Sequence, residues 1–130
     1  APGRVKLLGA LPADRLAEIY ALSDILVWPA VDEAFGIALL EAQAAGLPVV
    51  AGKARGVPDI IGSGVTGLLP PAGDPGAFAK AVQRLIDDPE LRGRMGSAAA
   101  RRVRAKFDLP TASAMLASTL NTVSIARPAP

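Results

Sequence analysis

Short, mostly apolar runs recur along the first half of the chain, and each is followed by Gly or Pro. Apolar runs of this length are typical of strands that are buried on both faces of a sheet. We therefore predict four strands, over Val5–Leu8, Ile25–Trp28, Pro48–Ala51 and Leu68–Leu69.

Segments with helical spacing separate these runs. Leu16, Ile19 and Tyr20 form one helical stripe within residues 14–22. Residues 36–45 are rich in strong helix formers, and Gly46 follows where a left-handed C-terminal cap is expected. Strands that alternate with helices predict an α/β fold with a Rossmann-like parallel sheet, because each right-handed crossover places a helix on the sheet.

Two longer helices are predicted after the last strand. Asp74-Pro75 and Asp88-Pro89 each supply an N-cap residue followed by Pro at the first helical position. Apolar positions then recur with helical spacing: Phe78, Val82, Leu85 and Ile86 in the first helix, and Leu91, Met95, Ala99 and Val103 in the second. We expect a single domain, residues 1–124, that ends in a helix over 111–123, and a flexible tail at 125–130.

Composition excludes several classes of site. The chain has 130 residues without Cys or His, which excludes disulfides, thiolate metal sites, zinc enzymes and Ser-His triads. A net charge of +2 and an aromatic content of 4% give no indication of nucleic-acid binding. We expect no metal, and we expect a cytoplasmic location because no apolar run approaches the roughly 20 residues that span a bilayer.

The candidate chemistry lies in residues 32–42, between the second predicted strand and the next helix. In a parallel α/β sheet this turn falls at the carboxyl edge, where ligands bind. A helix that begins near Gly36 leaves the N–H groups of Gly36, Ile37 and Ala38 without intrahelical partners. Such groups are suited to a phosphate or a sugar hydroxyl.

Two carboxylates flank this turn. Glu33 precedes the helix and Glu41 lies about five residues inside it, hence roughly 7 Å further along the helix axis. Because Glu41 is four residues after Ile37 and next to Leu40, we expect it to point inward, where an unpaired carboxylate is costly. The vicinal hydroxyls of a ribose would satisfy both carboxylate oxygens, which favours a nucleotide as ligand.

This segment resembles the Glu-x7-Glu motif of retaining GT-B glycosyltransferases of family 4, the glycosyl transferases group 1. Further blocks occur in the family's order: Ser23–Pro29, Glu41–Ala51, Gly56–Ile61 and Gly64–Leu69. The resemblance covers residues 5–108 and implies part of the C-terminal, donor-binding domain.

The resemblance also implies the roles of individual residues. Glu33 is the implied catalytic residue, which contacts the transferred sugar and stabilises positive charge on its ring. Glu41 is implied to bind the ribose of a nucleotide-diphosphate sugar, which is the donor substrate. The other implied contacts are the backbone of Phe35, Gly36, Ile37 and Ala38 with the sugar and diphosphate, and Gly9, Ala10 and Leu11 with the base.

The chain departs from the family pattern in several respects. The earlier Arg and Lys that neutralise the diphosphate are not present, and Arg4 and Lys6 do not match them. We expect the N-terminal domain that binds the acceptor to lie outside these 130 residues, and we therefore expect negligible transferase activity from this chain alone. Asp59 stands where the family commonly has Glu, and Ala30 where Ser often follows the Pro.

Several alternatives stay open. Glu33 and Glu41 can be solvated carboxylates, and Trp28 can be a core residue instead of a stacking surface. The six cations in residues 92–106 favour a solvated helix face over peripheral contact with an anionic membrane or an acidic partner. The whole chain can be a stand-alone nucleotide-binding or interaction module, or form a homodimer through an exposed sheet edge. The sugar, the base and the acceptor are not identified by the sequence.

Overall fold

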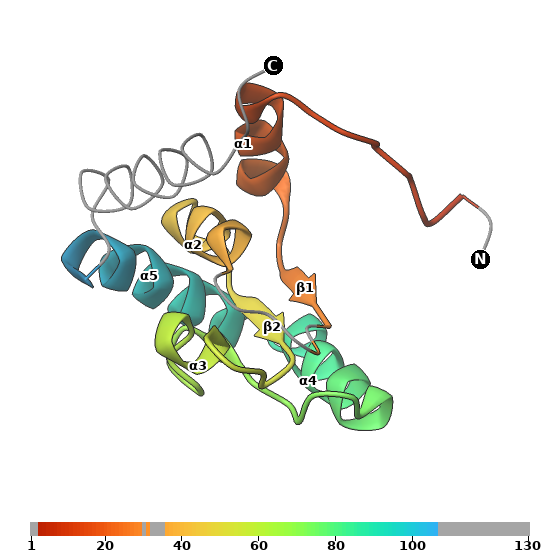
Figure 1. Ribbon diagram of the computed structural model, residues 1–130, viewed down its shortest axis with the longest axis vertical. Coiled ribbons are helices and arrows are strands. Elements are labelled where there is room, and N and C mark those ends of the chain that lie inside the picture. Colours follow the sequence, from red (N-terminus) through yellow and green to blue (C-terminus); the bar gives the residue numbers. More distant parts are fainter. Residues whose placement is uncertain (1–2, 30, 32–35, 107–130) are drawn as a thin grey trace, which may run out of the picture.

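A computed structural model describes residues 3–29, 31 and 36–106, and these residues form a parallel sheet with helices on both faces (Figure 1). The predicted α/β fold is therefore confirmed. The elements, in chain order, are α1 (Ala13–Leu22), β1 (Leu26–Trp28), α2 (Ile37–Ala44), β2 (Val49–Ala51), α3 (Val57–Ile60), β3 (Gly67–Leu68), α4 (Pro75–Asp87) and α5 (Pro89–Lys106).

The sheet of the described residues has three strands in the order β1-β2-β3, with β2 in the centre. Both pairs of strands are parallel, and Leu26 and Gly67 lie on either side of Val49. Gly67 approaches β2 so closely that a Cβ at this position would overlap the carbonyl oxygen of Val49. Glycine is thus required for β3 to pair with β2 in this register.

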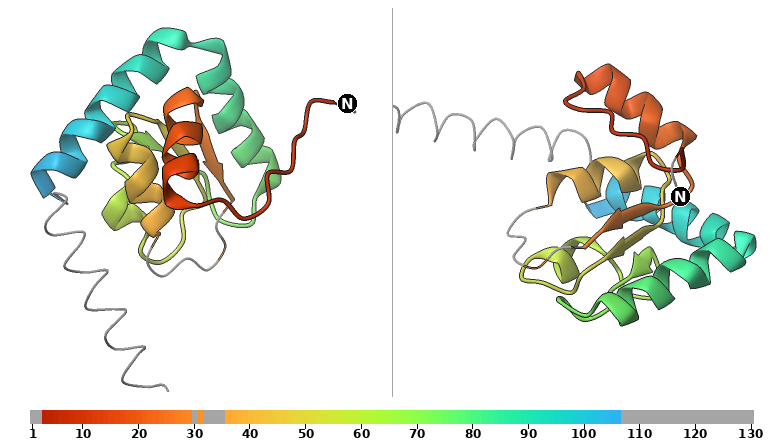
Figure 2. Two further views of the ribbon diagram at one scale, coloured as in Figure 1. Left: turned by 90° about the horizontal axis from the view of Figure 1, so that it is seen from above. Right: turned by 90° about the vertical axis from the view of Figure 1, so that its right-hand side faces the viewer.

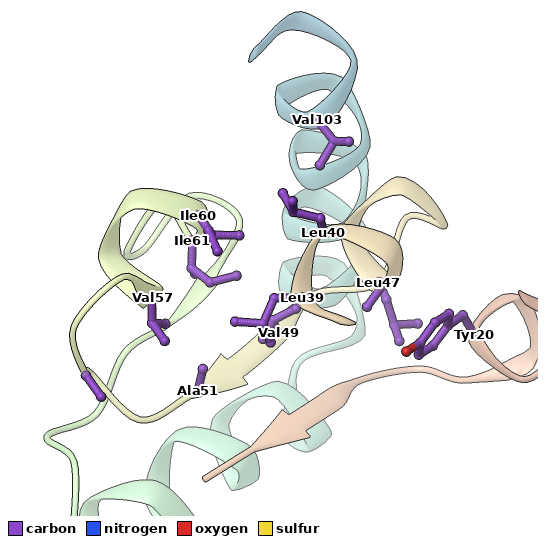
Figure 3. Close-up of a cluster of buried hydrophobic side chains, with 12 residues drawn as sticks. Tyr20, Leu39, Leu40, Leu47, Val49, Ala51, Val57, Ile60, Ile61 and Val103 are labelled. Carbon is purple, nitrogen blue, oxygen red and sulfur yellow. The ribbon is translucent and has the colours of Figure 1, made fainter. Parts of the chain in front are cut away.

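Two apolar clusters pack on the two faces of β2. On one face, Val49 and Ala51 join a cluster with Leu39 of α2, Ile60 of α3 and Val103 of α5 (Figure 3). On the other face, Val50 packs with residues of α4 and of the first half of α5: Leu85, Leu91 and Met95. All three residues of β2 are buried, as its continuous apolar sequence predicts.

The predicted starts of α4 and α5 are confirmed. The Asp74 carboxylate accepts a hydrogen bond from the Ala77 N–H at 3.0 Å, and the Asp88 carboxylate accepts one from the Leu91 N–H at 3.0 Å. Such N-caps contribute about 1 kcal/mol each. Arg92 then donates to the Leu85 and Ile86 carbonyls at 2.8 and 2.9 Å, which fixes the start of α5 to the end of α4. None of the helices in the described ranges is long and apolar enough to cross a membrane.

The strand predicted over Val5–Leu8 is wrong. These residues are extended but lead away from the sheet (Figure 1), and Val5 and Leu7 are 78% and 92% exposed. A strand exists only where a neighbour supplies its hydrogen bonds, and in the described chain no strand pairs with this segment. Helix α3 is a single helical turn over residues for which we predicted neither a helix nor a strand. The helix over 111–123 and the tail at 125–130 lie outside the described residues.

Candidate functional site

The strands β1 and β2 point the same way, so their carboxyl ends meet at one edge of the sheet (Figure 3). The Gly52 N–H, just after β2, donates to the carbonyl of Trp28 at the end of β1, at 3.0 Å. The next residue, Lys53, donates its N–H to the carbonyl of Pro70, after β3, at 2.8 Å. The segments that follow all three strands are therefore joined at this edge, which is the usual ligand-binding edge of such sheets.

Helix α2 begins at this edge, and Gly36 is its N-cap. Gly36 has a left-handed conformation, with φ 64° and ψ 44°. A Cβ at this position would lie 3.0 Å from Cδ1 of Leu39 and 3.1 Å from Cδ1 of Ile60. Both the backbone conformation and the available space thus require glycine, and the contact with Ile60 places α3 against the start of α2.

Ile37 and Ala38 form the first turn of α2, and both are half-buried. The Gly36 carbonyl accepts hydrogen bonds from the Leu39 and Leu40 N–H groups at 3.0 and 3.3 Å, so the helical pattern starts with these two donors. No intrahelical carbonyl is available to the N–H groups of Ile37 and Ala38, which lie at the positive end of the helix dipole. This arrangement favours a bound anion.

Glu41 is exposed, so the prediction that it points inward is wrong. The buried face of α2 is formed by Leu39, Leu40, Ala42 and Gln43, and Glu41 lies on the opposite face of the helix. Our prediction placed Glu41 by its spacing from Ile37, which is itself only half-buried. The carboxylate thus carries no burial cost that a ligand must offset.

Glu41 lies close enough to α1 to act on Tyr20. Burial, and after it the negative charge of Glu41, raises the pKa of Tyr20 above its ordinary value. The ring of Tyr20 packs beside Leu47, which lies between α2 and β2 (Figure 3). The second glutamate of the motif therefore lies on the α1 side of α2.

Gln43 is a buried polar residue that the sequence analysis missed. Its side chain is 0% exposed, and Nε2 donates to the carbonyls of Leu39 at 3.2 Å and Ile60 at 3.3 Å. Its Oε1 is buried and has no hydrogen-bond partner among the described residues. The amide thus joins α2 to α3. The sequence signal for its burial was the spacing of four residues from Leu39, which places both residues on the same face of a helix.

The loop after β2 carries two cations that we also missed, Lys53 and Arg55. Both side chains are exposed. Arg55 has a φ of 33° and is the one residue other than glycine with a positive φ in the described ranges. Their position directly after a predicted buried strand was a signal that they belong to the carboxyl edge.

The remaining predicted site residues are only partly described. Gly9 and Ala10 are exposed and Leu11 is half-buried, in the segment that leads into α1. Helices α1 and α2 begin on the side of the sheet toward which β1 points (Figure 2). Glu33 and Phe35 lie outside the described residues. In the residues that the structure does describe, no three potential metal ligands of the types His, Cys, Asp and Glu gather together.

Comparison with known proteins relates this chain to one family. The model of the family described as "Glycosyl transferases group 1" matches residues 1–102. The D-inositol 3-phosphate glycosyltransferase of Corynebacterium glutamicum (strain R) is 38% identical over 118 residues, which are 91% of this chain and 28% of the relative. The chain thus spans less than a third of the length of this curated relative.

Solved structures show the same relationship. The sucrose-phosphate synthase from Thermosynechococcus elongatus superposes with a TM-score of 0.81 at 31% identity, over 95% of this chain and 31% of the other. The Anabaena protein HepE, solved in complex with UDP and glucose, gives a TM-score of 0.76 at 31% identity, over 92% of this chain and 32% of the other. These structural similarities confirm the fold predicted from the sequence.

Proposed function

Because the chain belongs to the glycosyl transferases group 1 and has the fold of part of the C-terminal domain of a GT-B enzyme, we propose that it binds the nucleotide-diphosphate sugar donor of a longer enzyme. The observation that carries the proposal is the carboxyl edge of the sheet. There the left-handed Gly36 starts α2, and the N–H groups of Ile37 and Ala38 lie at the positive end of the helix. The binding of UDP and glucose by HepE supports the same ligand class.

The roles of individual residues are part of this proposal. The backbone of residues 35–38 would contact the sugar and the diphosphate, and Gly9, Ala10 and Leu11 would border the base. Glu41 would bind the ribose from the exposed side of α2, where its two oxygens can accept hydrogen bonds from two neighbouring hydroxyls. Its exposure means that the carboxylate needs no partner while the site is empty.

The proposed chemistry is transfer of the sugar with retention of configuration. The bond between the anomeric carbon and the diphosphate oxygen breaks, a bond from that carbon to the acceptor's hydroxyl oxygen forms on the same face of the ring, and the hydroxyl proton passes to the diphosphate. During the step, negative charge moves to the leaving diphosphate and positive charge develops on the sugar ring. The N-terminus of α2 would stabilise the leaving group, and Glu33 would orient and stabilise the sugar ring. We propose that the acceptor is bound by another part of the longer enzyme, so that this chain alone binds the donor without transferring the sugar.

Calorimetric titration of the chain with UDP, GDP and ADP tests donor binding. We expect saturable binding of one of them, weakened about tenfold or more in Glu41→Gln, a loss of about 1.4 kcal/mol in binding free energy. Glu18→Gln is the matched control, because Glu18 is also an exposed helical glutamate but lies on α1. If no nucleotide binds at millimolar concentration to a chain with a folded circular-dichroism spectrum, the proposal is wrong.

An interaction module is the second candidate, and one observation favours it. The strand β1 is at the edge of the described sheet, and Val27 in its middle is 46% exposed. An exposed apolar strand edge can pair with another chain. Light scattering across a range of concentrations tests this candidate, which predicts a dimer that Val27→Lys converts to a monomer.

A further inference from the structure

The loop after β2 is held by its backbone and by one buried side chain. Gly52 and Lys53 donate their N–H groups to the ends of the two neighbouring strands, as described above, and the Ala54 carbonyl accepts a hydrogen bond from the Val57 N–H at 2.9 Å. The Ala54 side chain is buried in the core, whereas the side chains of Lys53 and Arg55 on either side of it are exposed. The fold therefore fixes the backbone positions of Lys53 and Arg55, and both side chains extend away from the core.

Arg55 occupies a backbone conformation that favours glycine. A positive φ costs a residue with a Cβ about 1 kcal/mol or more, and glycine would adopt it without that cost. Arginine at this position places a charged side chain on the loop but leaves the backbone locally strained. Strained residues of this kind are concentrated at ligand-binding sites, which makes Arg55 a candidate for a contact outside the fold itself.

The two cations lie at the same edge as the start of α2. The bond from Gly52 to Trp28 joins their loop to the end of β1, and the approach of Ile60 to Gly36 joins α3, which follows the loop, to the start of α2. The edge thus combines two side-chain cations with the N–H donors of Ile37 and Ala38. Groups of both kinds favour negative charge, and guanidinium and ammonium groups bind phosphate oxygens well.

We propose that Lys53 and Arg55 bind phosphate groups of the ligand at this edge, an inference that rests on the proposed donor site. Lys53 supplies a compact charge and Arg55 a planar group that can bond two oxygens at once. The phosphate can come from the donor's diphosphate or from a separate inorganic phosphate. The chemistry of recognition is the same for both sources.

The test compares the binding of UDP, uridine, inorganic pyrophosphate and inorganic phosphate, followed by calorimetry. We expect the unaltered chain to bind UDP at least about tenfold more tightly than uridine, and the double variant Lys53→Gln/Arg55→Gln to lose most of this preference. Lys80→Gln/Arg84→Gln is the control with the same change in net charge, because Lys80 and Arg84 are exposed on α4.

A single substitution separates the side chain of Arg55 from its backbone. Arg55→Gly relieves the positive φ, so we expect it to fold at least as stably as the unaltered chain while it binds UDP more weakly. A variant that is stable and yet impaired in phosphate binding shows that the charged group, and not the shape of the loop, makes the contact. Unchanged affinity for UDP in Arg55→Gly would remove Arg55 from the proposal.

The competition experiments separate the two sources of phosphate. Displacement of UDP by pyrophosphate, lost in the double variant, assigns the cations to the donor's diphosphate. Binding of inorganic phosphate that leaves UDP affinity unchanged, and that the double variant loses, assigns them to a separate phosphate. If the double variant binds all four compounds as the unaltered chain does, the inference fails and nucleotide binding by the chain still supports the donor site. If none of UDP, GDP and ADP binds, the donor site fails, and the phosphate titration alone decides the inference.

Discussion

Gly96 of α5 lies directly against the carbonyl oxygen of Gly46, and a Cβ at position 96 would overlap that oxygen. Gly46 ends α2 with a φ of 83°, as predicted for a left-handed cap. Its N–H donates to the Gln43 carbonyl at 2.9 Å, and the next N–H, from Leu47, reaches the Ala42 carbonyl at 3.0 Å. One glycine thus ends α2, and a second allows α5 to cross that end at close range.

This crossing predicts opposite effects for two glycines of the same helix. Gly96→Ala forces α5 away from the Gly46 carbonyl and should lower the free energy of unfolding by about 1–3 kcal/mol. Gly93→Ala meets no atom within 4 Å and should raise it by roughly 0.5–1 kcal/mol, because alanine favours the helix. Urea denaturation followed by circular dichroism measures both. Equal effects of the two substitutions would contradict the close contact.

The start of α2 depends on Gly36 for two separable reasons. Gly36→Ala meets both a left-handed backbone and the side chains of Leu39 and Ile60, so we expect a loss of about 2–4 kcal/mol in unfolding free energy. Gly73→Ala is the control for the backbone alone, since Gly73 has a similar φ of 76° but nothing within 4 Å. It should cost only about 1–2 kcal/mol. Should both variants lose the same stability, the packing of Leu39 and Ile60 on Gly36 contributes nothing.

Tyr20 makes stability depend on pH in the alkaline range. Because its pKa is raised in the folded chain above the ordinary value of 10.0, both states hold the phenol proton well below pH 10 and stability there is independent of Tyr20. Between pH 10 and the folded pKa the unfolded state has lost its proton and the folded state keeps it, so stability falls as pH rises. Tyr20→Phe should remove this part of the fall.

The chain has one tyrosine, so its ultraviolet absorbance reports the titration of Tyr20 directly. Glu41→Gln should lower the pKa of Tyr20 only partly toward its ordinary value, because burial is the larger cause of the shift. Asp59→Asn, on α3, removes a negative charge elsewhere and should leave the titration unchanged. A pKa of Tyr20 that does not respond to Glu41→Gln would place the carboxylate away from α1.

Most elements could be predicted because their signals are local. The starts of α4 and α5 follow from Asp74 and Asp88, and β2 follows from three consecutive buried residues. The segment Val5–Leu8 has a similar local pattern, but a strand also needs a neighbour, and no local pattern contains one. Helices and strands were thus predicted correctly where N-caps or a run of buried residues determine them. The prediction failed where a strand depends on pairing with a neighbouring strand.

In the candidate site, too, local features could be predicted and contacts between distant segments could not. The position of Gly36 at the start of a helix was predicted, but its contact with Ile60 comes from a segment more than 20 residues later in the chain. Glu41 was misplaced because its orientation depends on the whole buried face of α2, which Leu39 and Gln43 define better than Ile37 does. Lys53 and Arg55 were recognised as candidate site residues only once the structure showed that their loop starts at the carboxyl edge of the sheet.

The backbone anchoring of the loop after β2 has a consequence for how a new ligand preference can arise. The N–H groups of Gly52 and Lys53 can hold the loop whatever side chains stand at positions 53 and 55, because these bonds are made by the backbone. These two positions can therefore accept mutations that alter selectivity without a matching loss of fold. Such a loop offers a route by which closely related chains diverge in the molecules they recognise.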